Sequence, residues 1–145
     1  HMDAALLPQN PNGAPTHTAA FIKNLLDGLR ALGPKLPIVT DGPNGAYTYA
    51  SDDNGILNFD QVIHLNIYPD IAPPYERTGA GDAFASTFSC AYLLGNSTAT
   101  ALKWGSINSM NVCQHVGAQK GLLKREDIEA YLAKAPAGWD VQIVK

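Results

Sequence analysis

Apolar residues between positions 19 and 32 recur every three or four positions, with polar residues between them. This spacing predicts an amphipathic helix, which Thr16 or Thr18 can cap at its start and Gly33-Pro34 ends. The prolines and the glycine of residues 8–16 predict a loop before it. The apolar face consists of Phe21, Ile22, Leu25, Leu26, Leu29 and Leu32.

Shorter β-prone runs follow this helix. Residues 37–40 predict a buried strand, residues 41–45 a turn and residues 46–49 the returning strand. Residues 51–55 predict a second turn, and residues 56–72 are strand-like but irregular. Together these runs predict a meander.

The last third of the chain is helical. Residues 81–94 and 98–116 predict a pair of helices, and residues 125–134 a shorter amphipathic one. Residues 117–121 predict a loop, and residues 139–144 a final strand. A helix, a set of strands and then paired helices indicate an α/β layered fold.

Composition limits the classes of function. A chain of 145 residues, 46% hydrophobic and 16% charged, suffices for one globular domain. A net charge of −3 gives no electrostatic footprint for nucleic acid, and no apolar run is long enough for a membrane helix. With no visible signal peptide, we expect a cytoplasmic protein. We interpret His1-Met2 as a remnant of cloning and residues 3–145 as a single α/β region.

Metal and disulfide chemistry are not indicated. Cys90 and Cys113 lie in apolar helical patterns, which predicts buried free thiols. No ligand spacing is found among the four histidines, which are His1, His17, His64 and His115.

The run Thr78–Phe84 carries the strongest chemical signal. Three small residues precede a carboxylate and an apolar helical stretch. Such a loop suits backbone N–H groups that hold an anion at a helix N-terminus. Asp82 would then lie at the mouth of the anion site, where it could accept a proton from a hydroxyl attacking a phosphoryl group. A role as helix N-cap is the alternative for Asp82, and the two are compatible.

The run Glu76–Phe84 resembles a motif of the ribokinase-like (pfkB) carbohydrate kinases, typically Asp-Thr-x-Gly-Ala-Gly-Asp before an Ala-Phe-rich helix. Residues 38–47 resemble the family's nucleotide-side strand and turn, and Gly117-Ala118 resembles its closing loop. The three blocks span Pro37 to about Leu132. The resemblance implies the C-terminal portion of a ribokinase-like α/β sandwich, truncated at the N-terminus.

The resemblance also implies ATP-dependent phosphoryl transfer to a hydroxyl of a sugar or nucleoside, with Mg²⁺ bridging the phosphates of ATP. Asp82 would be the catalytic base, and the N–H groups of Gly79, Ala80 and Gly81 the anion hole. The residues that would bind the nucleotide are Thr40, Gly42, Gly45, Ser106, Ser109 and Gly117.

Two departures from the family pattern stand out. Glu76 replaces the usual Asp, which in many members helps to hold a monovalent cation. The resemblance therefore implies a cation site at Glu76 and Thr78, and it leaves open whether the activity depends on that cation. The family's N-terminal half, with its sugar contacts and β lid, is missing. The Asn-x-x-Glu motif that organises Mg²⁺ is expected just upstream of Asp3.

Several positions keep a second interpretation. The turn at residues 40–45 by itself is an ordinary hairpin turn with Asp41 exposed. Polar residues of the long helix either line a ligand or form polar edges of helix packing; these are Asn108, Ser109 and Asn111. Trp104 is expected in the core and His115 on the surface. A solvated acidic face is expected for Glu126, Asp127 and Glu129.

Two other functions stay open. The chain could be a catalytically silent module that binds nucleotide weakly or associates with itself, as a homodimer or strand-exchanged oligomer. The third reading is a phosphomethylpyrimidine- or vitamin-type kinase of the same superfamily.

Overall fold

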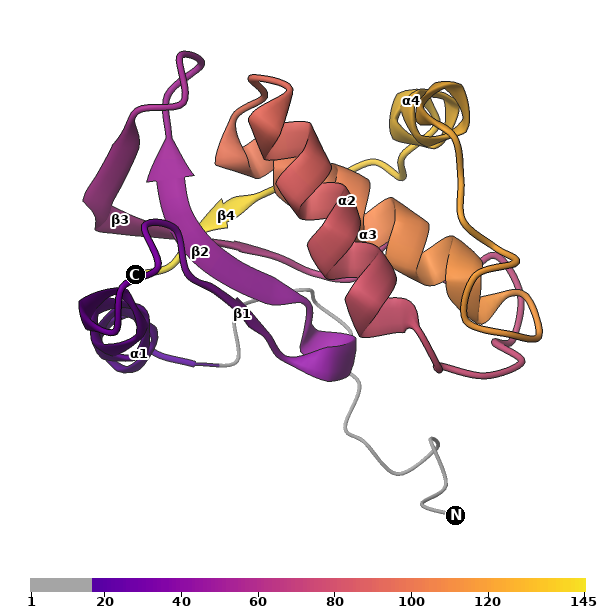
Figure 1. Cartoon of the computed structure of the whole chain (residues 1–145), viewed down its shortest axis with the longest axis horizontal. Helices are drawn as coiled ribbons and strands as arrows, with labels where there is room; N and C mark the ends of the chain where they lie inside the picture. Colours follow the sequence, from indigo (N-terminus) through magenta and orange to yellow (C-terminus); the bar gives the residue numbers. More distant parts are fainter. Residues whose placement is uncertain (1–16) are drawn as a thin grey trace.

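The computed structural model describes residues 17–145 and shows a helix, a strand meander and then packed helices (Figure 1). The predicted loop over residues 8–16, the cap Thr16 and the cloning remnant lie outside the described residues. The elements are α1 (Ala19–Ala31), β1 (Ile38–Thr40), the 3₁₀ turn η2 (Gly42–Asn44), β2 (Ala46–Ser51), β3 (Leu57–Leu65), α2 (Ala80–Leu93), α3 (Thr98–Cys113), α4 (Arg125–Ala133) and β4 (Gln142–Ile143).

The strands form one antiparallel sheet in the order β1-β2-β3-β4. A register shift between Tyr49 and Ala50 accounts for the irregular pattern of the segment that became β3. The final strand is shorter than predicted, two residues paired with β3. Trp139 instead donates from Nε1 to the carbonyls of Asn66 and Ile67, both at 3.1 Å.

Side chains of the sheet alternate between two apolar layers. Tyr47 and Tyr49 are fully buried in the layer that includes α1, while Ala46 and Ala50 face α2 and α3. Figure 1 shows α1 on one side of the sheet and the α2–α3 pair on the other. The predicted layered α/β arrangement is therefore confirmed.

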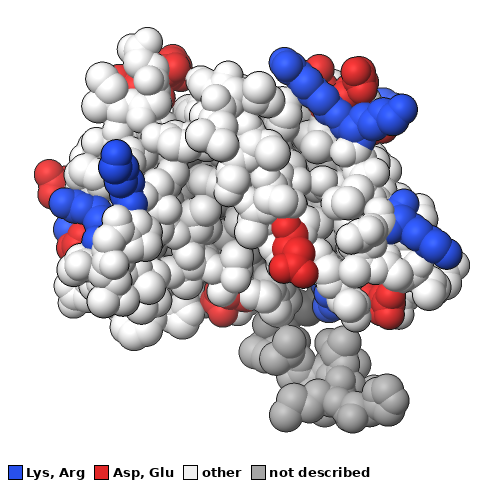
Figure 2. Space-filling view, viewed as in Figure 1, with Lys and Arg blue, Asp and Glu red and all other residues white. Residues whose placement is uncertain are grey.

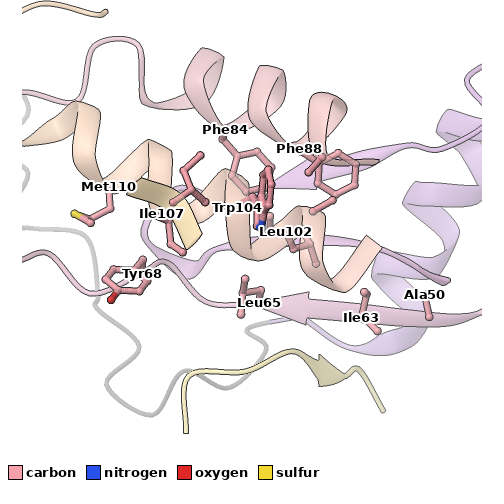
Figure 3. Packing of buried hydrophobic residues seen from close by; sticks show 14 residues of the cluster. Ala50, Ile63, Leu65, Tyr68, Phe84, Phe88, Leu102, Trp104, Ile107 and Met110 are labelled. Atoms are coloured by element: carbon pink, nitrogen blue, oxygen red, sulfur yellow. The ribbon is translucent and has the colours of Figure 1, made fainter. Parts of the chain in front are cut away.

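The larger core lies between the helices and the sheet (Figure 3). Phe84 and Phe88 of α2 meet Leu102 and Trp104 of α3 there, which confirms Trp104 as a core residue. A Cβ added to Gly105 would lie 3.0 Å from the ring and the carbonyl oxygen of Phe84. The missing side chain thus lets the backbones of α2 and α3 approach closely.

Some local expectations need correction. Gly79, with a left-handed φ of 85°, is the N-cap of α2, so Asp82 is the third helical residue and not the cap. Cys90 is exposed because Ala91, one position on, occupies the buried side of the helix, whereas Cys113 is buried; both thiols are free. His115 is exposed as expected, and so are the three acids of α4: Glu126, Asp127 and Glu129.

The turn η2 is bound by a buried histidine of β3, His64. The expectation of an exposed Asp41 is wrong, since its side chain is only 29% exposed. Its carboxylate lies 3.2 Å from His17 Nε2 and accepts from Asn44 Nδ2 at 3.2 Å. His64 is fully buried against the ring of Tyr47, with Nε2 2.6 Å from the Asn44 carbonyl. Burial lowers the pKa of His64, partly opposed by that hydrogen bond and by the charge of Asp41.

This buried histidine makes stability depend on pH. The folded-state pKa of His64 lies below its ordinary value near 6.5, so below that pH the unfolded chain binds the proton more readily. The stabilisation is complete above about pH 6.5 and is lost as the pH falls toward the folded-state pKa. We expect the free energy of unfolding in urea to fall between pH 7.5 and pH 5, and to fall less in His64→Gln, whose amide can still donate to Asn44. The other titratable residues are the same in both proteins, so parallel pH profiles would contradict the prediction.

Candidate active site

The start of α2 is held by a close backbone contact. A Cβ added to Gly79 would lie 2.7 Å from both the Cβ and the carbonyl oxygen of Ala118, in the loop after α3. The positive φ of Gly79 also disfavours any side chain. Only glycine therefore fits where these two loops meet.

Glu76 joins the same two loops. Its Oε1 accepts a hydrogen bond from the Gly117 N–H at 2.6 Å, across 41 residues of sequence. The residue predicted as a cation ligand thus contacts a backbone amide of the loop predicted to close the nucleotide site.

The first amides of α2 are only partly used inside the chain. The Ala80 N–H donates to the Arg77 carbonyl at 3.2 Å, so of the three predicted anion-hole amides this one already closes a turn. Within residues 17–145, the amides of Gly79 and Gly81 have no hydrogen-bond partner. Such amides, together with the positive end of the helix, can receive an anion.

Asp82 lies one residue further along α2 and is exposed. Its carboxylate has no hydrogen-bond or ion-pair partner among the described residues, while its backbone carbonyl accepts from Ser86 Oγ at 2.8 Å. The carboxylate is therefore open to a ligand at the head of the helix.

A cavity of about 300 Å³ lies beside the first residues of α2. It combines predicted positions from three parts of the chain, namely Thr40, Gly42, Gly45, Ala80, Gly81, Ser106 and Ser109. Gly117 does not line it, and its amide is bound to Glu76 instead. Asp82, Gly79, Glu76 and Thr78 are likewise outside the lining.

The polar residues of α3 divide into two groups. Ser109 lines the cavity, and Ser106 lines it while its Oγ accepts from the Tyr68 N–H at 2.7 Å. The amides of Asn108 and Asn111 donate to Thr87 Oγ1 and to the Gly121 carbonyl, both at 2.7 Å. The alternative of polar helix packing is therefore correct for the two asparagines.

Sequence reasoning missed two charged residues of this cavity. Arg77 and Asp70 both line it, with Nη2 3.5 Å from Oδ2. Cys113 lines it too, and burial raises the pKa of its thiol while the charge of Arg77 opposes that rise. The available signal was Arg77 itself, which stands where the family motif typically has Thr.

Other kinds of site find little support. On the face seen in Figure 2, lysine and arginine side chains lie in scattered small groups and form no broad basic surface. No helix within residues 17–145 has the length and apolar character needed to cross a membrane. In the same range, no three His, Cys, Asp or Glu side chains converge as metal ligands.

Comparison with known proteins settles the family. The family model of the pfkB carbohydrate kinases matches residues 4–125. The chain belongs to the pfkB carbohydrate kinase family. Acarbose 7(IV)-phosphotransferase of Actinoplanes sp. is 30% identical over 110 residues, which cover 76% of this chain and 34% of that protein.

Solved ribokinase structures share the fold. Ribokinase of Arabidopsis thaliana, complexed with ribose and ATP, superposes with a TM-score of 0.66 at 25% identity, covering 83% of this chain and 36% of that one. An E. coli protein assigned as a ribokinase II, solved with ATP and Mg²⁺, superposes with a TM-score of 0.64 at 23% identity. The match covers 82% of this chain and 35% of that one. This pfkB chain thus spans about one third of the length of these relatives.

Proposed function

We propose that this chain provides the nucleotide-binding and catalytic part of an ATP-dependent kinase that phosphorylates a hydroxyl of a sugar or sugar-like acceptor. One observation carries the proposal. A single cavity is lined both by the β1 end with its turn and by the N-terminal residues of α2, and Gly81 is next to Asp82 in sequence. Phosphoryl transfer needs this kind of positioning and charge stabilisation more than covalent chemistry.

The lining residues fit a nucleotide. Thr40, Gly42 and Gly45 offer a hydroxyl and backbone that phosphate and ribose can approach closely, while Ser109 and its apolar neighbours line the side of α3. When bound, ATP would supply the phosphoryl group, and Mg²⁺ would neutralise part of the charge of its phosphates. No three metal-ligating side chains converge within residues 17–145, so Mg²⁺ would enter the site together with the phosphates. This cofactor pair favours a cytoplasmic location.

Asp82 is the proposed general base. As the acceptor oxygen bonds to phosphorus and the bond to the departing ADP oxygen breaks, the Asp82 carboxylate takes the hydroxyl proton. The amides of Gly79 and Gly81 and the positive end of α2 stabilise the charge on the transferred group. The carboxylate is exposed and has no partner within residues 17–145, which supports this role.

If Asp82 is the general base, its removal should lower turnover without weakening ATP binding. Asp82→Asn should lower kcat by about 10²- to 10⁴-fold, because the amide cannot take the proton, and leave the affinity for ATP near that of the parent. Turnover is measured as ADP release over a panel of ribose, a nucleoside, an oligosaccharide and a hydroxymethylpyrimidine. Asp127→Asn is the matched control, since Asp127 is likewise the third residue of an exposed helix start. Near-parent turnover by Asp82→Asn would reject Asp82 as the base.

The choice of acceptor in the panel follows from the relatives. One is a phosphotransferase acting on acarbose and another is a ribokinase, so hydroxyl groups of sugars lead the proposal. Phosphorylation of the pyrimidine alcohol alone would favour the vitamin-type kinase instead.

Glu76 and Thr78 remain the proposed monovalent-cation site. Glu76 has a second role, because its carboxylate also connects two loops. Because the Glu76 carboxylate holds the Gly117 amide, Glu76→Gln should loosen the two loops and raise the KM for ATP several-fold. We expect K⁺ to stimulate the parent over choline at equal ionic strength, and the variant to lose that stimulation. If K⁺ does not change the turnover of the parent, Glu76 connects the two loops but does not bind a cation.

A self-associating, catalytically silent module is the second candidate. The observation in its favour is β1, which in the described part of the chain pairs with β2 alone and leaves its other edge open. An open edge can pair with a second copy. Light scattering should then give a multiple of 15.4 kDa with no ADP release, whereas turnover by the chain would reject the silent module.

A further inference from the structure

A pair of opposite charges, Arg77 and Asp70, lines the cavity. Among the side chains of residues 17–145 that line it, Arg77 carries the only positive charge and Asp70 the only carboxylate. They face each other with Nη2 3.5 Å from Oδ2. A ligand entering this space meets both charges and little other ionic character.

The backbone of Arg77 is part of a turn, and its side chain is half-exposed. Its carbonyl accepts the Ala80 N–H at 3.2 Å, so the residue is part of the turn that starts α2. The side chain is 47% exposed, and its recorded ion pair joins one nitrogen to one carboxylate oxygen at a long distance. A half-exposed pair of this kind is weak, and most of the five guanidinium donors remain available.

A polyphosphate would need this cation. Asp70 repels an anion in the cavity, and the chain as a whole carries a net charge of −3. The positive end of α2 offers partial charge only. The forked donors of an arginine match phosphate oxygens, so Arg77 can exchange a weak pair with Asp70 for a stronger one with phosphate.

We propose that Arg77 is a positioning residue that binds a phosphate of the nucleotide and makes the cavity selective for nucleotides over nucleosides. This inference rests on the proposed nucleotide site. Arg77 and the α2 amides hold the phosphates from adjacent positions of one turn, while the base and ribose contact the uncharged lining.

The test compares ligands with and without phosphate. Binding of ATP and of adenosine to this chain is measured by calorimetry. Arg77→Gln should weaken ATP about 10- to 100-fold, as expected for loss of a charge-assisted hydrogen bond, and leave adenosine within twofold. Arg77→Lys should recover part of the ATP affinity, because it keeps the charge without the fork. Arg125→Gln is the matched control, since Arg125 is also paired with a carboxylate, Glu129, but does not line the cavity.

Asp70→Asn distinguishes an Arg77 that binds phosphate from an Arg77–Asp70 ion pair that only stabilises the loop. It removes the ion pair and keeps the cation, so we expect ATP affinity equal to or tighter than that of the parent. If Arg77→Gln and Asp70→Asn both lose equal affinity for ATP and for adenosine, the inference is overturned, and the ion pair only stabilises the loop. A parent that binds both ligands, with Arg77→Gln binding ATP as tightly, would overturn this inference alone. A parent that binds neither ligand would overturn the proposed function as well.

Discussion

The site depends on the contact between two loops that are far apart in the sequence. Gly79 lies so close to Ala118 that no side chain fits between them, and the Glu76 carboxylate holds the Gly117 amide. These contacts fix the head of α2 against the segment that follows α3. Because an amide can receive an anion only from a defined position, the rigidity of this junction decides whether the helix start can act as a phosphate site.

The junction is in turn anchored by the buried face of α3. The Asn108 Oδ1 accepts the Leu123 N–H at 2.9 Å, and the Asn111 amide donates to the Gly121 carbonyl at 2.7 Å. These bonds tie the returning end of the loop to the helix from which it started. Gly105, whose missing side chain leaves room for Phe84, lets α3 lie close to α2. Core packing and loop geometry are therefore parts of one arrangement.

The sequence predicted what local patterns encode and missed what distant contacts decide. Helical spacing predicted α1 to within a residue or two, and the glycine-rich motif located the start of α2. Local patterns could not reveal that the Gly117 amide binds Glu76 and that Gly117 does not line the cavity, because the two residues of that hydrogen bond are 41 positions apart. Cys90 was misplaced because an apolar neighbourhood does not fix the rotation of a helix to within one residue. Arg77 was overlooked because its partner Asp70 lies outside the motif.

Glycine backbone forms part of the cavity lining, at Gly42, Gly45 and Gly81. A backbone amide keeps its chemistry whatever side chain its residue carries. The positions that cannot vary are those where the backbone must approach another segment. Gly45 is one, with a φ of 91° and a Cβ direction that meets the Leu65 carbonyl, and Gly79 is another. A charged side chain in the lining, such as Arg77, is free to differ between relatives, so such residues are where one kinase of this fold can acquire a ligand preference that another lacks.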